Sequence, residues 1–376
     1  MLVVGAAYEA GMRLKRVSQM GSGTLASICA QAGTENAAWL APREANWRMA
    51  TFDPKVLNQK PIGSGVVTVM ASDPTDGMLQ VSGGTGSSDA DTVRFTATAD
   101  IDGVTRTLVT DFVPLPSKVL EYAVFSNTTV GLQDAYVEGR IRANGDVTDW
   151  GGGGVFGDIT TVTGSVVSAG LDDDDTDLHM VADSLFMPVV DFNWFTMAGA
   201  KLTLPFDRVV DWAVIDASNN PHGSASPRAI YWINASGGNV YFYRCAIRAC
   251  IVILNANWVY FGGWSNWAAE IILESPDPDR LPALVVDGNL VMQIEAGSFT
   301  LGMQTYESHI DGVVYCTGEL WGPQYEADDP ILVKGALLAN EIHVMRAGTA
   351  VQHDTNLNIN PMVELTGLGL RPVRVP

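Results

Sequence analysis

One short phrase of apolar and aromatic residues occurs three times in this chain and restricts how it can fold. Residues 239–242 read Asn-Val-Tyr-Phe, residues 257–261 read Asn-Trp-Val-Tyr-Phe, and residues 289–292 read Asn-Leu-Val-Met. Units of roughly twenty residues that are built of strands rather than helices are typical of stacked β coils. The repeat therefore predicts a β-solenoid, in which each copy of the phrase lies on the one before it.

Short strands ended by Gly or Asn continue this pattern on both sides of the repeat. Gly and Asn tolerate the left-handed backbone angles that the corners of a coil require. Asparagine side chains at stacked corners can also hydrogen-bond along the axis. The strands expected outside the repeat are residues 122–125, 129–132, 135–138, 139–142, 144–147, 157–162, 164–167, 309–316 and 331–344.

The amino-terminal region has a helical rather than a strand-like pattern. Its apolar residues recur at a spacing of three to four positions, as on one face of a helix. We expect a break at residues 21–23, which read Gly-Ser-Gly, and a second helical piece over residues 24–40. The apolar positions of the first piece are Leu2, Val3, Ala6, Ala10, Leu14, Val17 and Met20.

Taken together, the patterns predict a mainly β protein with four parts. Residues 1–50 form the helical segment. Residues 51–115 form a small antiparallel β section, with strands at 65–70, 92–98 and 104–110 and a turn at 73–77. A right-handed parallel β-helix follows, interrupted by an insertion, and an extended tail ends the chain. The last boundaries are residues 116–355 for the β-helix, 171–206 for the insertion and 356–376 for the tail.

Charge and hydropathy exclude several classes of function. The 376 residues include 42 acidic and 22 basic ones, which gives a net charge of −20. Such a surface repels phosphate backbones, and there is no basic patch, so we expect no nucleic-acid partner. Residues 1–7 are apolar but much too short to span a membrane, and no later segment is long enough.

Several short motifs resemble a group of type IV pilin-like proteins, the large minor pilins related to the pilus-assembly X type. The family has an amino-terminal hydrophobic helix, an alanine-rich segment, a small β section and a distal β-helix. Residues 30–39 resemble the alanine-rich segment, and the family's amino-terminal membrane helix and processing site are missing or reduced here. The other similar motifs are residues 45–48, 63–69, 73–77, 122–127, 144–147 and 335–339.

The resemblance implies a non-enzymatic structural protein of a bacterial cell-surface or pilus-like filament, with a role in assembly or adhesion. Its partners would be other copies of the chain or pilin-like subunits, bound through the amino-terminal helix. It implies an extracellular or cell-surface location, and neither a catalytic site nor a cofactor.

Parallel β-helices also host polysaccharide lyases and hydrolases, so a carbohydrate-binding or carbohydrate-degrading protein is the alternative. Such enzymes need two carboxylates, or a carboxylate with a metal and a base. No spacing selects a pair among the candidates. These are the carboxylates Asp287, Glu295, Asp311 and Glu319 and the bases Arg244 and Arg248.

Metal binding has little support in the sequence. The acidic run Asp172, Asp173, Asp174, Asp175 and Asp177 lacks the spacing and glycine of an EF-hand, so a solvated loop is favoured over a calcium site. The histidines are scattered without metal-ligand spacing, and we expect ordinary, partly exposed side chains. They are His179, His222, His309, His343 and His353.

Two further sets of residues allow more than one interpretation. The cysteines Cys29, Cys245, Cys250 and Cys316 could include a disulfide between coils or could all be buried thiols. The aromatic residues predict a strip along one face that stacks on sugars or contacts a protein, with Trp258 in the core. The residues of this strip are Trp264, Trp267, Tyr315, Trp321 and Tyr325.

Overall fold

The computed structural model consists of two compact units, Met1–Leu115 with Thr366–Pro376, and Pro116–Leu365. The residues that the structure describes are 2–41, 55–74, 92–133, 135–150, 154–168, 178–181, 183–185, 187–188, 190, 192–262, 269–278, 281–294, 297–322, 331–345, 349–358 and 366–372.

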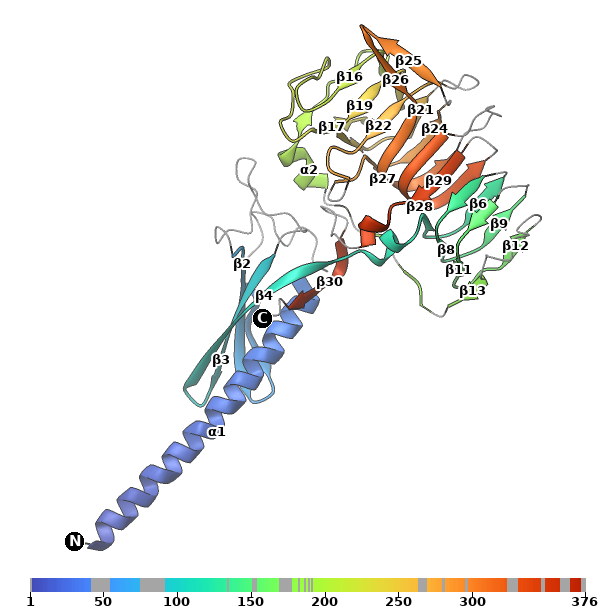
Figure 1. Ribbon diagram of the computed structural model, residues 1–376. Coiled ribbons are helices and arrows are strands. Elements are labelled where there is room, and N and C mark those ends of the chain that lie inside the picture. Colours follow the sequence, from blue (N-terminus) through green and yellow to red (C-terminus); the bar gives the residue numbers. More distant parts are fainter. Residues whose placement is uncertain are drawn as a thin grey trace. The chain divides into compact units, whose positions relative to one another are not determined.

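The first unit begins with a single helix, α1 (Leu2–Leu40) (Figure 1). The prediction of an amino-terminal helix is confirmed, but the break expected at residues 21–23 is wrong. A glycine inside a helix costs only about 1 kcal/mol relative to alanine. Packing of the following turns against a sheet offsets that cost, and Gly23 itself is buried beside Arg106.

Four antiparallel strands form most of this sheet, as the sequence predicts for three of them. They are β1 (Lys55–Ile62), β2 (Gly65–Ser72), β3 (Val93–Ile101) and β4 (Val104–Pro116). A fifth strand, β30 (Thr366–Pro372), lies next to β4. The end of the chain, which we expected to be an extended tail, therefore adds a strand to the sheet of the first unit.

Small residues bring α1 close to the sheet. Ala26, Ala30 and Ala37 are fully buried against a sheet face that includes Val67 and Phe95. Spacings of three and four residues place the small positions on one helix face. At Gly33 the approach is closest, because a Cβ atom there would lie 2.5 Å from Cγ1 of Val67. One face of α1 is thus committed to the sheet.

Among the described residues of the second unit, one sheet of 23 strands contains nearly all the regular structure. Its strands pair in parallel, and each short strand generally pairs with the strand three positions further along the chain. This period arranges the strands in three stacks. The prediction of a mainly β protein with many parallel strands is confirmed.

In each stack the strands follow one another in their order of pairing. The first stack contains β14 (Ala200–Lys201), β17 (Ile230–Asn234), β20 (Cys250–Leu254), β23 (Leu284–Val286), the middle of β27 (His309–Trp321), the middle of β28 (Ile331–Met345), β5 (Val124–Ser126), β8 (Ile141–Ala143), β11 (Ile159–Thr161) and β13 (Leu178–Met180). The second contains β15 (Val209–Asp211), β18 (Val240–Tyr243), β21 (Trp258–Gly262), β24 (Asn289–Gln293), the ends of β27 and β28, β6 (Val130–Gln133), β9 (Val147–Asp149) and β12 (Val166–Ser168). The third contains β16 (Val214–Ile215), β19 (Ala246–Arg248), β22 (Ile272–Glu274), the starts of β27 and β28, β29 (Thr349–His353), β7 (Tyr136–Glu138) and β10 (Gly154–Phe156).

The chain enters these stacks in the middle rather than at one end. Strands β5, β6 and β7 come first in the sequence, yet they pair with β28 and β29, which come last. From this junction the chain proceeds to β13 at one end. It then crosses to β14 at the other end and returns through successive strands to β28. The amino-terminal and carboxyl-terminal strands therefore meet edge to edge.

The repeated phrase lies in the second stack, where its copies are in register. Tyr241 pairs with Tyr260, Phe242 pairs with Phe261, and Phe261 pairs with Met292. The asparagines that open the phrase are linked along the stack, since Asn257 Nδ2 donates to Asn239 Oδ1 at 3.3 Å. The predictions of stacked copies and of an asparagine ladder are confirmed. Their alternate side chains, Val240, Phe242, Val259, Phe261, Leu290 and Met292, belong to one continuous core.

The segment between β13 and β14 connects the two ends of the first stack. We call its described residues within 181–199 the strap; they include a short helix, α2 (Phe192–Ala198). Asn144 Nδ2 donates to Leu185 O at 2.6 Å, and Tyr315 Oη donates to Pro188 O at 2.8 Å. Helix α2 contacts β17 and β20. The insertion predicted over residues 171–206 is thus the return path of the chain.

Because the strap covers it, the first stack is buried on both faces. Side chains that point away from the core, such as Val252, Val285 and Phe125, are as fully buried as those inside it. Strands buried on both faces have continuous rather than alternating apolar runs. This explains the unbroken Cys-Ile-Val-Ile-Leu sequence of β20.

The hydrogen bond between Tyr315 and the strap provides a test of this packing. We expect Tyr315→Phe to lower the free energy of unfolding of the second unit by about 1–2 kcal/mol, because the buried carbonyl of Pro188 loses its donor. Urea titration followed by circular dichroism measures the change.

Tyr306→Phe is the matched control. Its hydroxyl donates to the exposed side chain of Gln304 at 3.0 Å. Water can replace that donor, so we expect a loss of no more than about 0.5 kcal/mol. Equal losses in the two variants would contradict a special role for the bond to Pro188.

Candidate functional site

The outer faces of the three stacks are covered to different degrees. The strap covers the first stack. The hairpin of β25 (Ser298–Leu301) and β26 (Gln304–Glu307) covers part of the third, where Phe299 and Tyr306 pack on Ala246 and Ile272. No described helix or strand packs across the outer face of the second stack. This open face is the candidate functional site.

Aromatic rings follow one another along the open face. Tyr241 and Tyr260 are stacked with their centroids 4.9 Å apart and their planes at 12°. Trp321 and His343 are stacked at 4.2 Å and 26°. We call these four side chains the aromatic column. Val291 separates the two pairs, since it pairs with both Tyr260 and Trp321.

A glycine extends the column by one more ring. Gly131 is the register partner of His343 on the neighbouring strand β6. A Cβ atom at Gly131 would lie 2.8 Å from Cζ3 of Trp150 and 3.3 Å from Nδ1 of His343. The indole of Trp150, which is half exposed, therefore occupies the space that a side chain at position 131 would fill.

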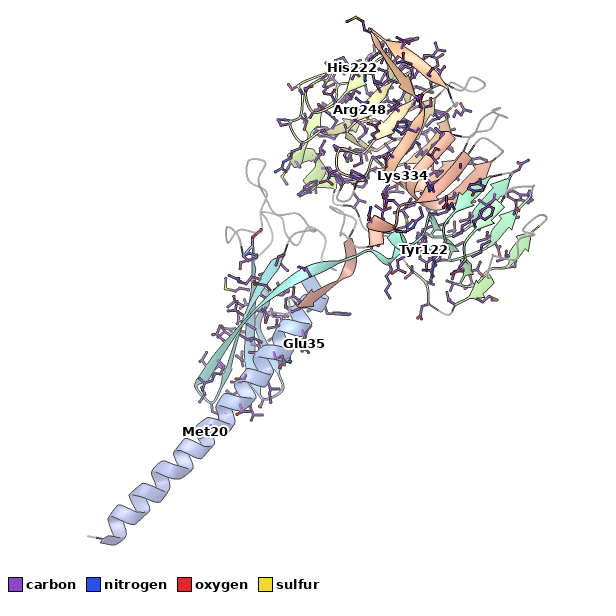
Figure 2. The ribbon with its side chains drawn as sticks, in the orientation of Figure 1. Met20, Glu35, Tyr122, His222, Arg248 and Lys334 are labelled. Atoms are coloured by element: carbon purple, nitrogen blue, oxygen red, sulfur yellow. The ribbon has the colours of Figure 1, made fainter. Side chains whose placement is uncertain are left out.

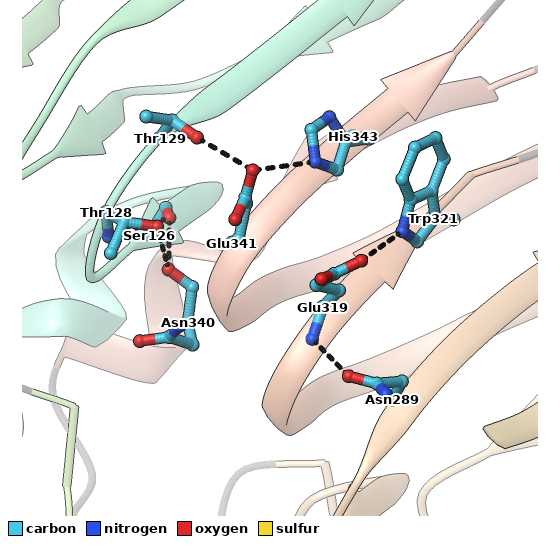
Figure 3. Close-up of polar contacts among 9 residues, drawn as sticks. All are labelled: Ser126, Thr128, Thr129, Asn289, Glu319, Trp321, Asn340, Glu341 and His343. Carbon is cyan, nitrogen blue, oxygen red and sulfur yellow. Dashed lines mark hydrogen bonds and ion pairs between the residues drawn. The ribbon is translucent and has the colours of Figure 1, made fainter. Parts of the chain in front are cut away.

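Two glutamates lie beside the aromatic column (Figure 3). Glu319 and Glu341 are register partners on adjacent strands, which are typically about 4.8 Å apart. Trp321 Nε1 donates to Oε2 of Glu319 at 2.9 Å. Thr129 Oγ1 donates to Oε1 of Glu341 at 3.3 Å. Glu319 Oε1 and Glu341 Oε2 accept no hydrogen bond from the described residues.

The position of His343 favours one tautomer. Its Nε2 atom lies 2.9 Å from Oε1 of Glu341, a carboxylate oxygen that only accepts. A proton on Nε2 satisfies this contact. The buried Nδ1 atom then carries a lone pair and has no partner among the described residues.

The structure brings only one of the predicted catalytic carboxylates to this face. Glu319 lies there, whereas Asp311 is on the third stack and Asp287 follows β23 of the first. Glu295 lies outside the described residues. Glu341, the neighbour of Glu319, was missed, because only the register between β27 and β28 brings these two side chains together.

The two arginines considered as bases are held in ion pairs. Arg244 Nε lies 3.0 Å from Oε2 of Glu270, and Arg248 Nε lies 2.8 Å from Oε2 of Glu274. His309 Nε2 also approaches Glu274, at 3.0 Å. Arg248, which is labelled in Figure 2, belongs to β19 of the third stack, whereas the aromatic column belongs to the second. These partly exposed pairs contribute little to stability.

Of the residues predicted to form an aromatic strip, Trp321 is the one that the described residues show in the aromatic column. Trp258 is outward and half-buried, so its assignment to the core is wrong; in β21 the buried positions are Val259 and Phe261. Tyr315 lies beneath the strap instead of on the strip. Trp264, Trp267 and Tyr325 lie outside the described residues.

The remaining histidines and acidic residues form no cluster with His343 in the part of the chain that the structure describes. His353 Nε2 lies 2.9 Å from Leu120 O, whereas His222 lies between β16 and β17. The backbone of His179 belongs to β13. The acidic run at residues 172–177 lies outside the described residues. Within them, no group of three or more His, Cys, Asp or Glu side chains could hold a metal ion.

All four cysteines are buried free thiols, which decides between the two alternatives left open by the sequence. Burial raises the pKa of Cys245 to about 12 and that of Cys316 to about 12. It also raises the pKa of Cys250. These thiols stay protonated at neutral pH, and protonated thiols are poor nucleophiles.

Thiol labelling tests this assignment. We expect no reaction with Ellman's reagent in the native protein at pH 8, and four reactive thiols after unfolding in guanidinium without reductant. The pKa values of Cys245 and Cys316 in the folded protein exceed the value of about 8.5 for an unfolded thiol. The free energy of unfolding should therefore decrease as the pH rises from about 8.5 toward 12. Fewer than four thiols in the unfolded chain would indicate a disulfide.

The contact between Gly131 and Trp150 predicts a second measurable effect. We expect Gly131→Ala to destabilise the protein by about 1–3 kcal/mol, because the new methyl group displaces the indole. In a Trp150→Ala background the same substitution should cost much less. A double-mutant cycle in urea measures the coupling. Additive effects would show that the indole does not occupy this space.

Comparisons with known proteins do not assign the chain to a family. No family model matches it, and no curated protein matches it. One solved structure, the competence-associated pilin ComZ from Thermus thermophilus, aligns over 94% of this chain and 97% of that chain, at 10% sequence identity and a TM-score of 0.30. A TM-score this low carries no argument about fold or function.

Proposed function

We propose that this protein is a non-enzymatic structural subunit of a pilin-like filament at a bacterial cell surface. In this proposal α1 packs against other copies of the chain or against pilin-like subunits. Residues 116–355 are displayed outward and act in assembly or adhesion. A surface with a net charge of −20 suits a protein that must remain soluble outside the cell.

The observation that carries this proposal is the length of α1 relative to its sheet. The helix has 39 residues, or about 58 Å at 1.5 Å per residue. The residues of α1 that are buried against the sheet lie between Gly23 and Ala38. Met20 is exposed beyond the sheet, and the helix continues past it (Figure 2). None of the described helices is long and apolar enough to cross a membrane.

The part of α1 before Met20 has the sequence of a packing helix. The unbroken backbone keeps positions 3, 7, 10, 14 and 17 within about one third of a turn of each other. They are occupied by Val, Ala, Ala, Leu and Val. An apolar stripe of this kind favours contact with another helix. Exposed Leu25 and Ile28 continue the stripe on the side of α1 opposite the sheet.

The pairing of strands supports a right-handed parallel β-helix as the outward part. Three parallel stacks with a period of three strands are what a solenoid of three-strand coils requires. Connections between parallel strands are right-handed in nearly all proteins, which supports the handedness. We propose no catalytic step, because Glu319, Asp311 and Asp287 lie on different stacks and both candidate arginines are held in ion pairs.

Substitution of the stripe tests the role of α1. We expect Leu14→Asp with Val17→Asp to abolish assembly, because each buries a charge in an apolar contact. Analytical ultracentrifugation and negative-stain microscopy of the full chain, alone and mixed with a pilin-like subunit, measure assembly.

Lys15→Ala with Gln19→Asp is the matched control. It changes the net charge by −1 − 1 = −2, as the test pair does, but on the other side of the helix. We expect this variant to assemble normally. Unchanged assembly of the Leu14 and Val17 variant would count against the proposal.

A further inference from the structure

The open face of the second stack has a composition that is unusual for an uncovered protein surface. Its aromatic column and Trp150 provide rings, while its neighbouring positions provide oxygen acceptors. Aliphatic residues are few: among the described positions in register with the column they occur at Val209, Val291 and Val167. We propose that this face binds a polysaccharide that carries free amino groups.

The rings make a polysaccharide the best fit. Aromatic rings combined with a few fixed polar groups are suited to ligands that have both apolar faces and polar edges, as sugar rings do. An apolar protein partner would instead require the aliphatic surface that this face lacks. The hydroxyl group of Tyr260 also adds a polar atom at the edge of its ring.

The carboxylates make amino groups the best fit. Glu319 and Glu341 each use one oxygen within the site and leave the other without a described partner. Two such oxygens on adjacent strands attract an ammonium group and repel uronic acids or phosphates. The nearby indole of Trp321 can add a cation–π contribution. No Lys or Arg occurs at the described positions in register with the aromatic column.

The spacing of the rings requires a polymer rather than a single sugar. The midpoint of the tyrosine pair and that of the Trp321–His343 pair are three strand separations apart, or about 14 Å. A ligand must be longer than one sugar ring to contact both pairs. Because the rings are carried by paired strands over a buried core, little conformational entropy is lost on binding.

Titration with defined oligomers tests this inference. The probes are a glucosamine hexamer, an N-acetylglucosamine hexamer, a galacturonate hexamer and hexalysine, with tryptophan fluorescence and calorimetry as readouts. We expect the glucosamine hexamer to bind at least about tenfold more tightly than any other probe, and more weakly as salt rises. No binding at millimolar glucosamine hexamer, or equal binding of the N-acetylated hexamer, would overturn the proposal.

Variants distinguish this face from general attraction to an acidic protein. Glu319→Gln with Glu341→Gln should weaken binding of the glucosamine hexamer at least about tenfold. Asp311→Asn with Glu138→Gln removes the same charge from the third stack, and it should have little effect. Equal losses, or hexalysine binding as tightly as the sugar, would indicate non-specific attraction and reject the site.

The contribution of the aromatic column can be tested with a second pair of matched variants. Tyr260→Ala should weaken binding of the glucosamine hexamer at least about tenfold, whereas Tyr136→Ala, on an exposed part of the third stack, should not. Circular dichroism verifies that both variants are folded. Loss of self-association in Tyr260→Ala, without any glycan binding by the unmodified chain, would assign the face to a second copy instead and reject the proposal.

Discussion

Pairing between β28 and the strands β5 and β6 is the interaction on which the second unit depends. It joins residues that are more than two hundred positions apart in the sequence, as in the bond from Thr128 Oγ1 to Asn340 O at 2.7 Å. Asn127 Nδ2 also donates to Asn340 Oδ1 at 3.3 Å. Without this junction the three stacks would be divided into two separate halves, one containing β5–β13 and the other β14–β29. Each half would have unpaired edge strands and an uncovered core at the break. Contacts of such long range are expected to form slowly, after the local stacks.

The junction also explains how the three outer faces come to differ. A chain that enters in the middle must travel from one end of the stacks to the other, and the strap is that path. It covers the first stack and removes it from the surface. The hairpin of β25 and β26 protects part of the third. Among the described residues, the second stack alone keeps a column of aromatic rings beside carboxylates, and this is the face for which we propose a glycan ligand.

Much of the second unit could be predicted from the sequence, because a strand repeat carries its own register. The matching Asn-Val-Tyr-Phe phrases are enough to place Tyr241 on Tyr260. Trp258 was misplaced because repetition shows which residues stack but not which face they occupy. Which residues face the core depends on the strand as a whole. In β21 buried and half-buried side chains alternate, and this alternation assigns Val259 and Phe261 to the core. An insertion was expected where the strap lies, but its contacts could not be predicted, since they join positions such as 144 and 185 that share no sequence pattern.

The corner residues show a similar limit. Asn255 has a positive φ of 51°, as the sequence pattern suggests, but Trp212 and Arg244 have φ values of 49° as well. Such angles cost a side chain about 1–2 kcal/mol. The Arg244 guanidinium lies over the Trp212 ring at 5.0 Å, and this cation–π contact between the two residues offsets part of the cost. Sequence propensity alone does not reveal contacts of this kind.

Entry in the middle has a mechanical consequence. The chain reaches the stacks just before β5 and leaves them just after β29, and these two places are joined by the contact of His353 with Leu120. Because both connections lead to the first unit, a pull on that unit reaches the second unit at its central strands and not at β13 or β14, the two ends of the first stack. A protein attached in this way could keep both ends of its stacks folded under tension.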